Sequence, residues 1–450
     1  MNLLNLCKRH SRRRWVIGFL VSVNMGLSAA NPAAAADYKE ALARVLDDHK
    51  RLLGVQADLR ASEAVFGKAR AAWAPELAVS GNIGHSSQRV GADNEASSLA
   101  PREMTFSLNQ LVWDFGKTRA EIDRAALQRQ LSSLTVVTTK QDLLLEGLTA
   151  YINLHRARVT LDYARKSIDN IRRQTGQEES MVALGSGLPT DVLQAKSQLA
   201  GAQARGVLAH GALDAAVNRY VALYYEEPPE LASIQPIPIP FEVLPATLED
   251  AIDIAFESNS LLKRLALQEQ MAEAEFRRVK GDELTPAFNL IAQAKFKENT
   301  DNIRGQRKER LVKFQMDFPF NLGLASLRSR EAARESLLSA RFRLDDAQDT
   351  LIEQVRNSWQ GLLTARGNAD FLMNQARITA EFLELARQER LLGTRSLIDV
   401  LTGETALINA ESFATSAEAD VGIAAFTLLR TIGVLSLDVL EENQADLGSH

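Results

Sequence analysis

Cysteine is almost absent from the chain: Cys7 is the only one, and none follows residue 36. Beyond that point no disulfide, thiol nucleophile or cysteine metal site is available. Five histidines follow residue 36, each isolated, and the sequence has neither a phosphate-binding glycine loop nor a G-x-S-x-G sequence. These absences argue against an enzyme, and we expect no catalytic residue, cofactor or metal.

Proline and long apolar runs are also scarce. The 450 residues include 12 prolines, and half of these lie between Glu226 and Pro245. Past residue 36 there is no run of 18 apolar residues, so we expect no helix that crosses a bilayer. The remainder is rich in Ala, Leu, Glu, Arg and Gln, a mixture typical of long helices rather than of several globular domains.

The first 36 residues have the pattern of a secretory signal peptide. Five cations, the last of them Arg14, precede the apolar stretch Trp15–Ala30, and Ala34-Ala35-Ala36 offers a cleavage site. An uncleaved membrane anchor is the alternative. Cleavage would move the net charge from −5 to about −10. Such an acidic protein is a poor ligand for nucleic acid, and we expect no nucleic-acid partner.

The rest of the chain is duplicated at an offset of 208 positions. Gly185 and Gly393 are each followed, after five residues, by Asp-Val-Leu, and apolar residues then recur every seven positions from Val192 and Val400. Two long helices should therefore turn and restart at equivalent places. We expect a first repeat at 37–227, a Pro-rich linker at 228–246, a second repeat at 247–440 and a polar tail at 441–450.

Each repeat should contain a helix, two strands and two long helices. The helical periodicities predict helices at 38–72, 118–184 and 190–225, and again at 247–280, 323–392 and 396–434. Alternation with period two predicts strands around residues 77–83, 104–108, 288–296 and 312–320. Polar tips, Ser86–Arg102 and Glu298–Arg310, should separate the strands of each pair.

The four strands alternate apolar with polar residues and are long enough to cross an outer membrane when tilted. A soluble sheet with one covered face is the alternative, but the rest of the chain is long helix with nothing to cover that face. Aromatic residues stand at the strand ends, where interfacial aromatics belong: Trp113, Phe115, Phe318 and Phe320. Four strands cannot close a barrel, so a cyclic homo-oligomer with 8, 12 or 16 strands is expected.

In these features the sequence resembles the TolC family of outer-membrane export channels over essentially all of the chain past residue 36. The resemblance rests on the signal peptide, Trp73-Ala74-Pro75, Thr285-Pro286, the stretch Leu111–Gly116 and the two glycine turns. It implies a mainly α-helical fold with transmembrane strands, in which a homotrimer forms a twelve-stranded β-barrel and a duplicated α-helical barrel. It further implies an outer-membrane location, contact with outer-membrane lipid, a periplasmic adaptor, and an inner-membrane pump or ABC transporter.

The resemblance also implies a gate at the two turns. The gating arginine of the family falls on Arg395, its threonine and aspartate partners on Thr190 and Asp191, and a pore-lining aspartate on Asp399. In two places the sequence departs from the family pattern: Arg390 replaces a gating tyrosine, and Thr402 replaces a second acidic residue. We expect Arg395 to donate to Thr190 or to nearby backbone, and Arg390 to pair with Asp191 on the same or an adjacent chain. Solvated turns with ordinary surface charges are the alternative.

The function expected from the sequence is a passive exit channel of a tripartite efflux or type I secretion system. A periplasmic coiled-coil adaptor or a helical scaffold without a pore is the alternative. Three acidic residues seven positions apart, Glu404, Glu411 and Glu418, are interpreted as a solvated or lumen-facing helix stripe rather than as a site.

Overall fold

The computed structural model describes residues 38–90, 95–282, 285–301, 303–318 and 325–439. The expected signal peptide, the polar tail and Phe320 lie outside these ranges. The described chain is mainly helical with a small set of strands, which confirms the fold class expected from the sequence.

The first repeat begins with two short helices, α1 (Tyr38–Asp48) and α2 (Lys50–Ala71), and ends with two long ones, α3 (Lys117–Ala183) and α4 (Pro189–Tyr224). The strands β1 (Glu76–Ile83), β2 (Ser86–Val90), β3 (Glu95–Leu99) and β4 (Arg102–Trp113) lie between them. A short 3-10 turn, η1 (Leu231–Ser233), follows in the linker.

The second repeat has the same order with two strands fewer. Its helices are α5 (Leu248–Ser258), α6 (Ser260–Asp282), α7 (Ala325–Leu391) and α8 (Leu397–Ile432), and its strands are β5 (Ala287–Glu298) and β6 (Gln306–Asp317). Helices α3 and α7 each have 67 residues, and α4 and α8 each have 36. The duplication thus preserves the length of the long helices.

Two single helices expected from the sequence are each broken in two. The breaks fall at His49 and Asn259, which have nearly the same extended backbone, with φ of −66° and −61°. In each case the side chain caps the helix that follows: His49 accepts from the amide of Arg51, and Asn259 accepts from the amides of Leu261 and Leu262. Because neither residue is glycine or proline, the periodicity gave no sign of a break.

The polar tips are shorter than expected. Within Ser86–Arg102, β2 and β3 pair as an antiparallel hairpin, and Arg102 already belongs to β4. In the second repeat, β5 continues to Glu298 and β6 starts at Gln306, so Arg310 lies inside a strand rather than in the tip. Charged residues thus extend along both strands without ending them.

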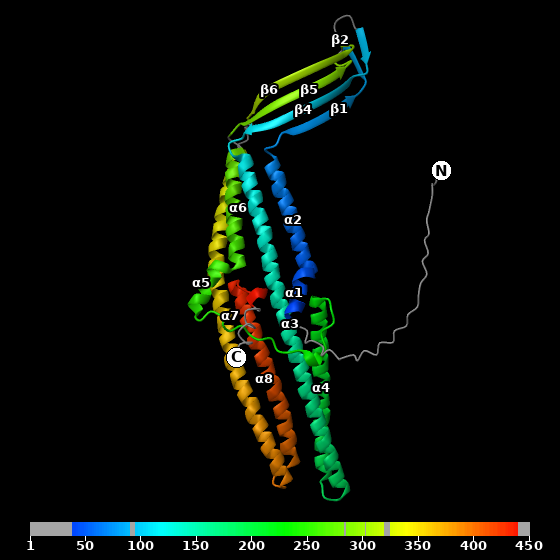
Figure 1. The fold of residues 1–450 in the computed structure, drawn as a ribbon, viewed down its shortest axis with the longest axis vertical. Coiled ribbons are helices and arrows are strands. Elements are labelled where there is room, and N and C mark those ends of the chain that lie inside the picture. Colours follow the sequence, from blue (N-terminus) through cyan, green and yellow to red (C-terminus); the bar gives the residue numbers. More distant parts are fainter. Residues whose placement is uncertain (1–37, 91–94, 283–284, 302, 319–324, 440–450) are drawn as a thin grey trace, which may run out of the picture. The chain divides into compact units, whose positions relative to one another are not determined.

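The strands β1, β4, β5 and β6 form one antiparallel sheet in that order, which β4 and β5 link across the two repeats (Figure 1). At the end of β4, the buried carboxylate of Asp114 accepts from the amides of Gly116 and Thr118 at 3.2 and 2.7 Å. Gly116 has φ of 92°, a conformation that glycine adopts without strain, and α3 starts at the next residue. This explains the Trp-Asp-Phe-Gly sequence at the entry to the long helix.

The two repeats pack together through α3 and α8, which lie side by side in Figure 1. Their buried residues belong to one core, whose fully buried members include Leu148 and Leu154 of α3 and Phe426 and Leu428 of α8. Ile234 and Ile237 of the Pro-rich linker are buried in the same core. The linker therefore does more than connect the repeats, because it covers part of the contact between them.

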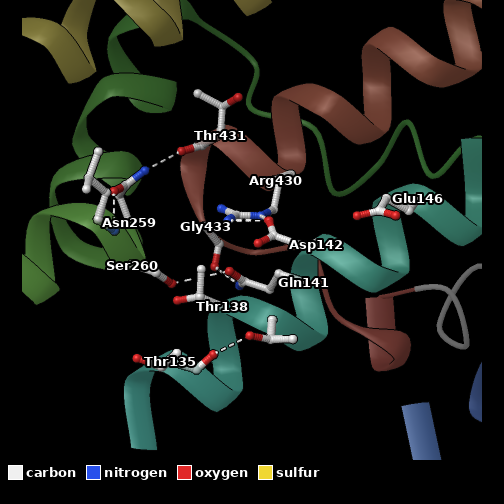
Figure 2. Close-up of polar contacts among 12 residues, drawn as sticks. Thr135, Thr138, Gln141, Asp142, Glu146, Asn259, Ser260, Arg430, Thr431 and Gly433 are labelled. Atoms are coloured by element: carbon white, nitrogen blue, oxygen red, sulfur yellow. Dashed lines mark hydrogen bonds and ion pairs between the residues drawn. The ribbon is translucent and has the colours of Figure 1, made fainter. Parts of the chain in front are cut away.

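A polar joint lies at the C-terminal end of α8, where α3, α5 and α6 meet it (Figure 2). The side chain of Asn259 donates to the carbonyl of Thr431 at 2.7 Å, and Gln141 of α3 donates to the carbonyl of Gly433 at 2.8 Å. Gly433 has φ of 88°, and an added Cβ would lie 2.6 Å from the carbonyl oxygen of Ser258. Glycine is therefore required at this position.

The equivalent joint in the first repeat is built from side chains instead. Tyr225 follows α4 with φ of 59°, and its ring stacks on His49 with 5.3 Å between ring centroids. The ammonium group of Lys50 also lies over the Tyr225 ring, 5.3 Å from its centroid. Burial and the nearby charge of Arg51 hold the pKa of the His49 imidazole below its usual value, which favours the neutral ring in this stack.

In the described ranges, every helix is too short or too polar to span a membrane.

The joint gives a test of how the repeats are held together. Asn259→Ala should lower the free energy of unfolding by about 1–3 kcal/mol, because a partly buried carbonyl and two helix-start amides lose their partner. Thermal unfolding followed by circular dichroism measures this. The same change at Asn218, which is exposed on α4, should cost less than about 0.5 kcal/mol. Equal effects at the two sites would contradict the assigned role of Asn259.

Candidate gate at the paired helix turns

The turn after α3 and the turn after α7 have the same backbone. Gly185 and Gly393 adopt φ of 79° and 77°, and the amides of Ser186 and Thr394 each donate to the carbonyl five residues earlier at 3.0 Å. This pattern satisfies the last carbonyls of each helix and reverses the chain. Pro189 then opens α4, and the Ser396 side chain caps α8 by accepting from the amide of Asp399.

Both candidate gating arginines make ion pairs within the chain. Arg390 donates to Glu178 of α3 at 2.5 Å, and the side chain of Glu178 is only 5% exposed. Arg395 donates to Glu389 of α7 at 2.6 Å and lies over the ring of Phe382, 5.3 Å from its centroid. Arg390 therefore connects the two repeats, whereas Arg395 bonds within its own hairpin.

These contacts correct the expected pairing within one chain. Arg390 pairs with Glu178 rather than Asp191, and Arg395 with Glu389 rather than Thr190. Contacts from these arginines to Thr190 or Asp191 of an adjacent chain stay a prediction.

The other three candidate residues have free side chains at the turns. Thr190 and Asp399 are exposed, and Asp191 is half-buried in the first turn of α4. In the described part of the chain, neither Asp191 nor Asp399 has an ion-pair partner. Two carboxylates at the starts of α4 and α8 are therefore open to a neighbouring molecule or to solvent.

A second cross-repeat contact centres on Glu404 of α8, which is 4% exposed. Its Oε1 accepts from Arg387 of α7 at 2.5 Å and from Gln174 of α3 at 3.2 Å. Its Oε2 accepts from Asn170 of α3 at 3.3 Å. A small apolar cluster of Ile171, Ala195, Ala202, Leu397 and Leu401 accompanies this contact. Glu404 is thus bonded to both neighbours of its helix.

The first repeat contains the equivalent ion pair between its two long helices, with the acid and the base exchanged. Glu179 of α3 and Lys196 of α4 stand at the positions of Arg387 and Glu404, and they pair at 2.8 Å. Their side chains are 49% and 55% exposed, whereas that of Glu404 is 4% exposed. Likewise Leu401 of α8 is fully buried, but its equivalent Leu193 in α4 is 68% exposed. Within one chain, α3 covers this face of α8, and no described element covers the same face of α4.

The sequence reasoning missed Glu178, Arg387 and Glu404. Glu404 was one of three acids expected on a solvated or lumen-facing stripe, and for this residue the expectation was wrong. Burial raises the pKa of the Glu411 carboxyl, whereas Glu418 is exposed. The exposure of the three acids therefore increases along α8. The seven-residue spacing identified a common face but gave no sign of the helix that covers it.

Among the residues that the structure describes, no three His, Cys, Asp or Glu side chains are grouped so that they could hold a metal ion.

The family model named "Outer membrane efflux protein" matches residues 41–224, which hold most of the first repeat. The outer membrane efflux protein BepC of Brucella suis biovar 1 (strain 1330) is 23% identical over 407 residues, which cover 89% of this chain and 86% of BepC. The outer membrane protein TolC of Escherichia coli (strain K12) is 24% identical over 409 residues, covering 86% of this chain and 80% of TolC.

The chain is similar in sequence to outer membrane efflux proteins, to the family model over residues 41–224 and to individual relatives over most of its length.

Solved structures of outer-membrane channels share the fold. The chain aligns with the outer-membrane channel OprN with a TM-score of 0.77 and 17% identity, covering 88% of this chain and 90% of OprN. The CmeC outer membrane channel of Campylobacter jejuni gives a TM-score of 0.77 and 13% identity, covering 91% of this chain and 88% of CmeC. The fold is therefore that of outer membrane efflux proteins over both repeats.

The contact at Glu404 can be tested in isolation. Glu404→Gln removes the charge that three donors share, and it should weaken the contact between the two hairpins by about 1.5–3 kcal/mol. Amide hydrogen exchange should then be faster at the tips of α3, α7 and α8. Glu418→Gln on the exposed side of the same helix is the matched control. If exchange is equally unchanged in both variants, Glu404 does not hold the hairpins together.

Proposed function

We propose that the protein is the outer-membrane exit channel of a tripartite efflux or type I secretion system. It acts as a passive conduit, without catalysis, and it works with a periplasmic adaptor and an inner-membrane pump or ABC transporter. The single observation that carries this proposal is the sheet formed by β1, β4, β5 and β6, in which, among the residues that the structure describes, one face is apolar and uncovered and both edge strands lack an outer partner.

The apolar face supports a lipid environment. Ile83, Val312 and Phe314 are 85%, 72% and 63% exposed, and nothing in the described chain covers them. Three of the four strands have 12 residues, which is enough to cross an outer membrane when tilted. A soluble adaptor or scaffold with this face in water would aggregate, so the exposed face argues against that alternative.

The two open edges support assembly from several copies. Strands β1 and β6 each leave one row of backbone donors and acceptors unpaired, which lipid cannot satisfy. Pairing of β6 in one copy with β1 of the next would close the sheet, and a homotrimer would give twelve strands. The long helices continue from the sheet as two hairpins per chain, which then form the periplasmic tunnel.

The gate is proposed at the inner end of this tunnel. Arg390 and Arg395 hold the turns through Glu178 and Glu389, and they stand beside the open side chains of Thr190 and Asp191 from the neighbouring copy. Asp399 contributes an acidic ring just inside. The contacts to Thr190 and Asp191 of the neighbouring copy lie at the surface, and each is worth only about 0.2–1 kcal/mol, so a partner that competes for these groups can open the mouth.

The facing of the strands is the first test. Phe314→Asp places a charge on the lipid face, which costs about 2 kcal/mol or more near the bilayer midplane, and should reduce the amount of trimer in the outer membrane. Gln315→Asp, one residue along and on the opposite face, should have a mild effect. Heat-modifiable trimers are measured in isolated outer membranes. Equal losses for the two variants would refute the assigned facing and, with it, the channel.

The gate is the second test. Replacing Arg390 and Arg395 together with Ser leaves Glu178 buried without its partner and should raise the single-channel conductance in planar bilayers, with the trimer intact. Cation preference should persist in that variant and should fall on Asp399→Ala. Arg377→Ser is the control, because Arg377 pairs with Glu381 on the exposed side of α7. A double variant that conducts like the parent would place the gate elsewhere.

A further inference from the structure

The strand register gives each face of the sheet a definite set of residues. Across β4, β5 and β6, one row contains Arg102, Glu298 and Gln306, the next contains Met104, Phe296 and Lys308, and the third contains Phe106, Ala294 and Arg310. All of these side chains belong to the apolar face, because alternate residues of a strand point to the same side. Closer to the helices the same face is apolar, and its residues there include Leu77, Leu108, Leu290, Val312, Phe314 and Met316.

The charged residues of the apolar face therefore gather at one end. Four of them lie at the end of the sheet that carries the turn between β5 and β6: Arg102, Glu298, Lys308 and Arg310. At the opposite end, near the helices, the rings of Trp113, Phe115, Phe288 and Phe314 form a continuous chain with centroids 5.6–6.3 Å apart. The turn end of the apolar face thus combines cations with the Phe106–Phe296 ring pair, whereas its helix end is a border of aromatic rings.

On the opposite face, the charges at the turn end neutralise one another. Lys297 pairs with Glu309 at 3.2 Å and with Asp301 at 3.6 Å, while Arg307 pairs with Glu309 at 2.9 Å and also with Asp301. The apolar face has no such network. Arg102 lies 3.9 Å from Glu298, and in the described residues Lys308 and Arg310 have no acidic partner. Both are exposed.

At the border of the apolar face, three cations stand with only one acid. This excess of positive charge can bind an anion from outside the chain. The methylene stems of Lys and Arg can lie along the apolar rows while the charged heads reach the aqueous boundary. Arg102 and Lys308 stand on strands separated by β5, roughly 10 Å apart, and Lys308 and Arg310 are roughly 7 Å apart along β6. Phosphate groups are suited to this arrangement, since Arg binds them with paired hydrogen bonds and Lys as a point charge.

We propose that Arg102, Lys308 and Arg310 bind the phosphate groups of an anionic lipid headgroup in the outer leaflet of the membrane. The orientation rests on the proposed function, in which the helices lie on the periplasmic side and the turn end of the sheet points outward. The lipid is of the phosphorylated glycolipid class, and its acyl chains pack against the apolar rows below. These contacts anchor the sheet at its outer border, as the aromatic chain anchors it at the inner one.

The test compares two double variants with the same change of charge. Lys308→Gln with Arg310→Gln alters the apolar face on β6, while Lys295→Gln with Lys313→Gln alters the opposite face on β5 and β6. Purified trimers are titrated with bisphosphorylated lipid A in mixed micelles, and binding is measured by native mass spectrometry. The first variant should bind about tenfold more weakly or worse, through loss of charge-assisted contacts, and the second should bind like the parent.

Two further arms define the ligand. Lipid A stripped of its phosphates should bind the parent as weakly as bisphosphorylated lipid A binds the first variant, and inorganic phosphate alone should not compete. Equal affinity of the two double variants, or equal binding of the dephosphorylated lipid, would overturn the proposal. If the first variant does not assemble, Lys308→Gln and Arg310→Gln are measured singly. Failure of the parent to form membrane trimers would instead refute the channel itself.

Discussion

The packing of α8 against α3 determines which surfaces of the chain are satisfied internally and which are left for a neighbour. This contact buries the core around Phe426 and Leu428 and places Gln141 against the end of α8. It also brings Glu404 to Asn170 and Gln174. Because the chain is duplicated, the equivalent contact would be made by α4 with α7. Within the described chain those helices do not pack together. The exposed Leu193 marks the surface that remains open.

The same asymmetry explains the chemistry of the two hairpins. In α7 and α8, the pair Arg387–Glu404 is covered by a third helix, and the buried acid has several donors because it cannot rely on water. In α3 and α4, the charge-reversed pair Glu179–Lys196 stays in solvent and needs no further partner. The two equivalent ion pairs thus differ in the order of their charges and in their burial, and only one of them is covered by another helix. In the proposed channel, the contacts between neighbouring helices around the tunnel would therefore alternate in strength.

Much of the fold follows from residues with a clear local meaning. Pro75, Gly116, Gly185 and Gly393 mark the ends of elements, and alternation in β6 predicted which face is apolar. The breaks at His49 and Asn259 could not be predicted in this way, because polar side chains make them by capping. The structure of the proposed gate was predicted only in part. Its turns follow from glycine spacing, but the partners of Arg390 and Arg395 depend on which helices meet, and α3 supplies Glu178 from a distant part of the sequence.

The joint at the ends of α4 and α8 shows what duplication does to mutational tolerance. At Gly433 the backbone of Ser258 and Asn259 fills the space that a side chain would need, so every substitution there strains the chain. At Tyr225 the same backbone conformation carries a large ring that packs on His49. The second repeat therefore accepts only glycine at this joint without strain, whereas the first repeat has space there for a side chain. Over evolutionary time the first repeat can accumulate change at a joint where the second cannot.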